Sequence, residues 1–245
     1  MSFLIAVNVI IRGLNPNIVG LTIAAVSLGG FISYVPASYM AETLGRKRCV
    51  GIGCCLTIIA SAIQVAVQNN WVFLGTRVLA GAGTGIAQIA APPLVTEIAH
   101  PRQRQTATGL YNAAWCMGAI VSAAVTFATL SIANSWSWRV PCLLQAAYPI
   151  IQLIGLLFVP ESPRWLVSKN RKDEALTILA KYHANGDADD RLVQHEFRQI
   201  CSSINQETSS WSSLISSRGD IHRLTICIMV GFMQEWAGNG TKAKP

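Results

Sequence analysis

Charged residues are scarce in this sequence, and their scarcity excludes an ordinary soluble domain. Asp, Glu, Lys and Arg make up 13% of the 245 residues, against about 25% in a typical soluble domain. Five stretches carry no charge at all: residues 13–41, 49–76, 78–96, 105–138 and 140–160. These stretches are about 19 to 34 residues long, and a helix needs about 20 residues to cross the hydrocarbon core of a membrane. The sequence therefore predicts an all-α, polytopic helical membrane protein.

The sequence also lacks the groups of residues on which enzymes depend. It contains no paired nucleophile and base, no phosphate-binding loop and no cluster of metal-ligating side chains. No two of the seven cysteines form a C-x-x-C pair, so we interpret them as small apolar side chains. The glycine-rich run at residues 81–85 lies inside an apolar stretch, which indicates close helix packing rather than a dinucleotide loop. We expect no enzymatic activity, no metal ion and no cofactor.

Basic residues follow alternate predicted spans. The spans are expected over residues 18–39, 49–67, 71–94, 106–131 and 139–159. Most of the 19 Lys and Arg residues, which give the chain a net charge of +7, come after the first, third and fifth of these spans. The positive-inside rule places such residues in the cytoplasm. No face combines basic and aromatic residues, so nucleic acid is not an expected partner.

We expect four segments along the chain. A short apolar stub covers residues 1–17, and a five-helix transmembrane bundle covers 18–159. A cytoplasmic loop with short surface helices follows over 160–223, and an incomplete transmembrane helix with a tail over 224–245. Within the loop, Ala175, Leu176, Leu179 and Ala180 recur at helical spacing, and a second short helix is expected over 191–204. A solvated linker is the alternative for this segment.

Three charged clusters stand at the predicted cytoplasmic ends of spans. They read ETLGRKR (42–48), EIAHPRQR (97–104) and PESPR (160–164). A carboxylate at the edge of the hydrocarbon core is costly unless it is paired, and arginine pairs it through two hydrogen bonds. The clusters could latch helix ends together as a cytoplasmic gate, or they could serve only as topology anchors. The candidate gate residues are Glu42, Arg46, Glu97, Arg104, Glu161 and Arg164.

The order and spacing of these clusters resemble a known family. ETLGRKR, GTRVLAGAGTGI, LVTEIAHPRQR and PESPRWL occur in the sequence in that order. Together they are similar to the motifs of the sugar porter branch of the major facilitator superfamily. SWSWRVPCLLQ, YHANGD and QEWAGNG narrow the resemblance to fungal hexose and lactose permease-like members. The resemblance covers about residues 20–240, which correspond to family spans two to six and the start of span seven.

The resemblance implies a fold, a function and a set of site residues. It implies the N-terminal half of a major facilitator fold without most of its first helix. It further implies transport of a hexose or disaccharide by alternating access, with a proton as a candidate co-substrate and the plasma membrane as the location. The charged clusters would form the inner gate, and Arg77 would be structural. The implied sugar contacts are Asn112, Gln234, Glu235 and Asn239. Glu235 departs from the amide that the family carries there, and a helix–helix hydrogen bond is the alternative role of Asn112.

Members of this family have twelve spans, so the chain resembles only part of one. We expect it to be an incomplete copy of a sugar transporter. One alternative is a short, non-transporting membrane protein that binds a full-length relative. Another is a homodimeric pore in which two copies replace the two halves. In each case the lipid bilayer surrounds the helices, and association with a like chain would use the open flank of the bundle.

Overall fold

The computed structural model describes residues 16–67, 69–129, 136–206 and 218–236. These ranges are helical and contain no strand, in agreement with the predicted all-α class. The chain divides into two compact units, residues 1–200 and 201–245, which are described separately. The helices are α2 (Pro16–Thr43), α3 (Arg46–Ala66), α4 (Asn70–Ile98), α5 (Arg104–Thr129), α6 (Trp136–Phe158), α7 (Pro163–Ser168), α8 (Lys172–His183), α9 (Arg191–Gln206) and α11 (Arg218–Trp236).

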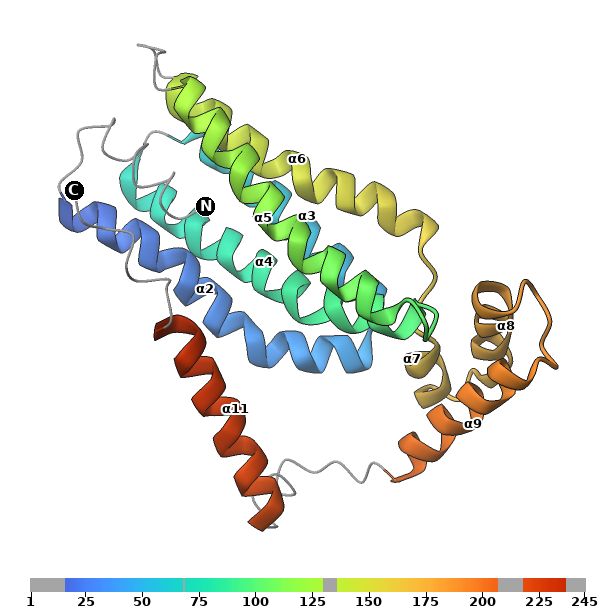
Figure 1. The fold of residues 1–245 in the computed structure, drawn as a ribbon. Helices are drawn as coiled ribbons and strands as arrows, with labels where there is room; N and C mark the ends of the chain where they lie inside the picture. Colours follow the sequence, from blue (N-terminus) through green and yellow to red (C-terminus); the bar gives the residue numbers. More distant parts are fainter. Residues whose placement is uncertain (1–15, 68, 130–135, 207–217, 237–245) are drawn as a thin grey trace. The chain divides into compact units, whose positions relative to one another are not determined.

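Five of the described helices, α2 to α6, are long and apolar enough to cross a membrane. They lie side by side in the first unit, and α7 and α8 stand at one end of this bundle (Figure 1). At that end α2, α4 and α6 finish and α3 and α5 begin. We call it the α7 end. The five spans that the uncharged stretches predict are therefore present, and the prediction of a multi-pass helical membrane protein is confirmed.

Helix α4 packs against both α2 and α3 through glycines. A Cβ added at Gly81 would lie 2.1 Å from the carbonyl oxygen of Val26, and one added at Gly29 would lie 2.0 Å from that of Val78. The backbones of α2 and α4 are thus in direct contact, an approach that only glycine permits. The expected close packing at these glycines is confirmed. Beside the contact lies the apolar core of the bundle, formed by Ala37, Cys49, Val50, Cys54, Ile86, Ala90 and Ala91.

Helices α5 and α6 contact this core through partly buried side chains, among them Tyr111 of α5 and Leu156 of α6. Among the described residues of α5, only Thr126 and Thr129 are buried. Large apolar side chains elsewhere on the helix, such as Trp115 and Phe127, are more than two-thirds exposed. One side of the five-helix bundle is therefore an apolar surface within the described part of the chain.

Two short helices pack together at the α7 end. The buried residues Leu179 and Ala180 of α8 contact Val193 of α9. Asp173 and Glu174 stand in the first turn of α8 and Lys181 and His183 in its last, a distribution that favours the helix dipole. The expected helices in this segment are confirmed, and α9 continues two residues beyond its predicted end at 204.

The second unit contains α11, which begins earlier than the sequence indicates. We expected an incomplete span from residue 224, whereas the helix starts at Arg218. An ion pair of 3.7 Å joins Asp220 in its first turn to Arg223 in the next, and such i, i+3 pairs stabilise a helix modestly. Helix α11 is not among the five described helices that are long and apolar enough to cross a membrane.

The contact between α2 and α4 generates a stability prediction. Gly81→Ala should lower the free energy of unfolding by about 1–3 kcal/mol, because the added methyl group overpacks against a backbone that cannot move aside. Thermal unfolding of the purified protein, followed by tryptophan fluorescence, measures the effect. Gly75→Ala on the same helix is the matched control, since nothing lies within 4 Å of its added Cβ. Equal melting temperatures for Gly81→Ala and Gly75→Ala would contradict the prediction.

Candidate functional site

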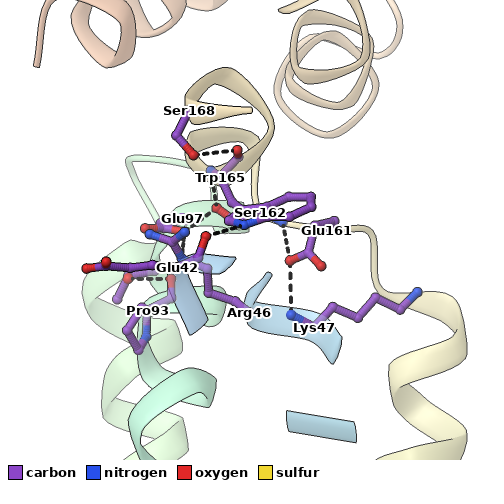
Figure 2. A network of polar contacts seen from close by, with 10 residues as sticks. Glu42, Arg46, Lys47, Pro93, Glu97, Glu161, Ser162, Trp165 and Ser168 are labelled. Carbon is purple, nitrogen blue, oxygen red and sulfur yellow. Dashed lines mark hydrogen bonds and ion pairs between the residues drawn. The ribbon is translucent and has the colours of Figure 1, made fainter. Parts of the chain in front are cut away.

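Polar side chains from four parts of the chain meet at the α7 end. They come from the α2–α3 turn, the last turn of α4, the segment between α6 and α7, and α7 itself (Figure 2). The candidate site is therefore a junction between helix ends. Its members are Glu42, Arg46, Lys47, Glu97, Glu161, Ser162 and Trp165.

The carboxylate of Glu161 caps the N-terminus of α3. Its Oε1 accepts a hydrogen bond of 2.9 Å from the backbone N–H of Lys47, the second residue of α3. The first N–H groups of a helix have no partner within the helix and carry a partial positive charge. Residue 45, which precedes α3, is a glycine and offers no side-chain cap. A carboxylate more than a hundred residues away in sequence supplies the cap instead.

Gly45 is required for this contact in two ways. Its φ of 101° lies in a region that side chains other than glycine rarely adopt. A Cβ at this position would also lie 2.5 Å from Oε2 of Glu161 and 3.3 Å from the ring of Trp165. The glycine of the ETLGRKR motif thus makes both the turn and the space for the carboxylate.

A second carboxylate, that of Glu97 at the end of α4, pairs with two partners. Arg46 approaches it with Nε 3.5 Å from Oε2, and both side chains are more than four-fifths buried. The hydroxyl of Ser162 donates a hydrogen bond to the same Oε2. Burying a carboxylate is costly unless it is paired and hydrogen-bonded, and these two contacts meet that requirement.

Ser162 and Trp165 fasten α7 to this junction. Ser162 is fully buried, and its hydroxyl accepts the backbone N–H of Trp165 at 3.2 Å as the cap of α7. The indole N–H of Trp165 donates to the backbone carbonyl of Glu42 at 2.9 Å, across to the end of α2. Helix α7 and the two residues before it therefore contact the ends of α2, α3 and α4.

The structure brings together some of the predicted gate residues and places others elsewhere. Arg46, Glu97 and Glu161 meet at the junction, whereas Glu42 enters it through its backbone carbonyl. Arg104 pairs with Glu196 of α9 at 3.7 Å. Arg164 lies partly buried in the first turn of α7.

Two further predicted residues, Arg77 and Asn112, lie on other parts of the five-helix bundle. Arg77 is 1% exposed inside the bundle, and its guanidinium carbon lies 4.9 Å from the centroid of the Phe73 ring. Asn112 is exposed on α5. Gln234 and Glu235 fall in the last turn of α11, in the second unit, where their side chains lie outside the described residues, as does Asn239.

Sequence reasoning missed the part played by Ser162, Trp165 and the backbone of Lys47. A signal for α7 is present, since serine followed by proline is a typical helix start. Nothing in the sequence, by contrast, reveals that Glu161 would bind a distant helix terminus. Within the ranges that the structure describes, no group of three or more His, Cys, Asp or Glu side chains could hold a metal ion.

Comparison with known proteins agrees with this architecture. Residues 15–241 match the family described as "Sugar (and other) transporter". The low-affinity glucose transporter HXT1 of Saccharomyces cerevisiae is 30% identical, over 90% of this chain and 40% of its own length. The MFS-type transporter criB of Aspergillus cristatus is 29% identical, over 80% of this chain and 42% of its own. The chain thus spans about two-fifths of the length of these relatives.

Solved structures of a major facilitator protein share the fold. The structure of the proton:xylose symporter XylE bound to 6-bromo-6-deoxy-D-glucose superimposes with a TM-score of 0.72 at 20% identity, over 88% of this chain and 50% of that one. The inward-open structure of XylE from E. coli gives the same TM-score over 91% and 51%. The likeness shows that the described helices form part of a major facilitator fold.

The family match extends over most of the chain and includes all the helix ends that meet at the junction. Members of this family are transporters rather than enzymes. The chain belongs to the sugar transporter family of the major facilitator superfamily.

Proposed function

We propose that the protein moves a hexose or disaccharide across a membrane by alternating access. The observation that carries this proposal is the match of residues 15–241 to the sugar transporter family. Relatives named as glucose transporters support the choice of substrate class. In transporters of this superfamily the substrate lies between two halves that rock about it, so the complete activity requires both halves.

Within this mechanism, we assign the junction at the α7 end to the gate on that side of the membrane. Its contacts link the ends of α2, α3 and α4 through α7 and the segment before it. All are hydrogen bonds or ion pairs, which can break and re-form without rebuilding an apolar core. Their partly buried setting makes each contact stronger than it would be in water. This is what a gate requires: closed and open states that differ by a few contacts.

Two finer features belong to the proposal. The plasma membrane is the expected location, because transporters that take up external sugars act there, and the relatives include yeast hexose transporters. Co-transport of a proton is the expected coupling, supported by the likeness to a protein named as a proton:xylose symporter.

Sugar uptake into cells that lack their own hexose transporters tests the function, and alkalinisation of the medium during uptake tests the coupling. Surface expression without saturable uptake of any hexose or disaccharide would overturn the proposal.

One prediction for transport concerns the cap of α3. Glu161→Ala, made in the complete transporter, should lower the maximal uptake rate about tenfold with little change in the amount at the cell surface. A hydrogen bond to a charged group contributes about 1.5–3 kcal/mol, and its loss shifts the equilibrium between gate states. Radiolabelled sugar uptake, normalised to surface protein, measures the effect.

Glu174→Ala is the matched control for Glu161→Ala. Glu174 is an exposed carboxylate that pairs with Arg171 on the surface of α8, so its removal should leave uptake unchanged. Arg164→Ala should slow uptake in the same way as Glu161→Ala if the whole PESPR motif serves the gate. If Glu161→Ala and Arg164→Ala both transport sugar normally, the charged clusters serve only as topology anchors.

Another prediction for transport concerns sugar recognition by Asn112. Asn112→Ala should raise KM about two- to tenfold at an unchanged maximal rate, since a neutral hydrogen bond contributes about 0.5–1.5 kcal/mol. Asn112→Gln keeps the amide and should retain most of the affinity. Gln105→Ala, an exposed amide at the start of the same helix, is the control. An unchanged KM for Asn112→Ala would leave Asn112 the role of a helix–helix contact.

A further inference from the structure

His183, the last residue of α8, is a buried side chain that the proposed transport mechanism does not use. Only 2% of its side chain is exposed. Its Nδ1 lies 2.5 Å from Oε2 of Glu196 on α9, and its Nε2 lies 3.1 Å from the backbone carbonyl oxygen of Ile98. Ile98 is the last residue of α4. The ring thus contacts α9 and the end of α4 at the same time.

The two partners of His183 are both hydrogen-bond acceptors. A carboxylate oxygen and a carbonyl oxygen accept hydrogen bonds and donate none. A neutral imidazole has a single N–H, so one of its nitrogens would face an acceptor with a lone pair. Both contacts are hydrogen bonds only when both ring nitrogens carry a proton, and this holds for either orientation of the ring.

Two helix ends and a shared carboxylate surround the ring. His183 stands at the C-terminal end of α8 and touches the C-terminal carbonyl of α4, and both helix ends carry partial negative charge. Oε1 of Glu196 also pairs with Arg104 of α5 at 3.7 Å. The Glu196 carboxylate therefore contacts both the His183 ring and the Arg104 guanidinium.

A second histidine, His100, lies beside this ring. The His100 ring lies edge-on to His183, with centroids 5.4 Å apart. Its Nδ1 accepts the backbone N–H of Arg102 at 3.2 Å. The two adjacent rings thus differ in their contacts, because both nitrogens of His183 face oxygen acceptors.

We propose that His183 is a protonation-dependent latch that holds the α8–α9 pair on the ends of α4 and α5. When the ring is charged, it bridges Glu196 and the Ile98 carbonyl. When it loses its proton, one of the two contacts sets an acceptor against a lone pair, and the helix pair detaches more readily. Because attachment requires the proton, the latch is strongest at low pH and weakens as pH rises. Histidine is the side chain that most readily gains or loses a proton near neutral pH, which makes it suited to such a latch.

Hydrogen exchange tests the latch in the full chain, purified in lipid nanodiscs. Amide exchange in α8 and α9 is compared at about pH 6 and about pH 8, after correction for the intrinsic effect of pH. Protection should fall with rising pH by at most about tenfold per pH unit, the slope for the release of one proton. In His183→Gln the pH dependence should vanish. His195→Gln, which removes an exposed histidine of α9, should behave as the wild type.

A direct measurement keeps the proposal testable if His183→Gln fails to fold. The nitrogen chemical shifts of the wild-type histidine rings report how many protons each ring carries. The chain has four histidines, and single variants of the other three assign the remaining signal to His183. Two protonated nitrogens at about pH 6.5 support the latch. A neutral His183 ring at that pH, wild-type protection independent of pH, or unchanged pH dependence in His183→Gln would overturn it.

Discussion

The direct backbone contact between α2 and α4 is the constraint on which the rest of the bundle depends. Gly29 and Gly81 bring each helix against a carbonyl oxygen of the other, and Gly83 does the same for α4 against α3 at Gly53. In a bilayer, where lipid tails are as apolar as leucine, helices associate through such close packing rather than through the hydrophobic effect. Once α2, α3 and α4 are fixed in this way, their ends lie near enough for short polar side chains to join them at the α7 end.

The sequence predicts the fold well because the bilayer imposes simple rules. Long stretches without charge become spans, and the five predicted spans correspond to α2–α6. The amphipathic spacing around Ala175 and Leu179 likewise predicts α8, whose buried face carries both residues. The start of α11 is less predictable: the apolar stretch begins only after Arg223, whereas the helix already starts at Arg218 and carries an i, i+3 ion pair between Asp220 and Arg223.

The sequence predicts which charged residues lie at the site, but not which groups they contact. Acid and base at the ends of spans indicate charged contacts, and Arg46, Glu97 and Glu161 do meet. Their partners, however, include groups that a sequence does not display: the backbone N–H of Lys47 and the backbone carbonyl of Glu42. Likewise, nothing in the spacing of the clusters indicates that Arg104 pairs with Glu196 on α9. Such contacts depend on the three-dimensional approach of helix ends, which only the structure supplies.

The hydroxyl of Ser162 has a consequence for how movement passes through the molecule. It gives its one hydrogen to Glu97 of α4 and accepts the backbone N–H that begins α7. A displacement of α4 that pulled Glu97 away would release this hydroxyl to rotate, and α7 would lose the orientation of its first turn. A rigid shift of a long helix would thus be converted into loosening of a short one. The Ser162 hydroxyl thus couples the position of Glu97 on α4 to the first turn of α7.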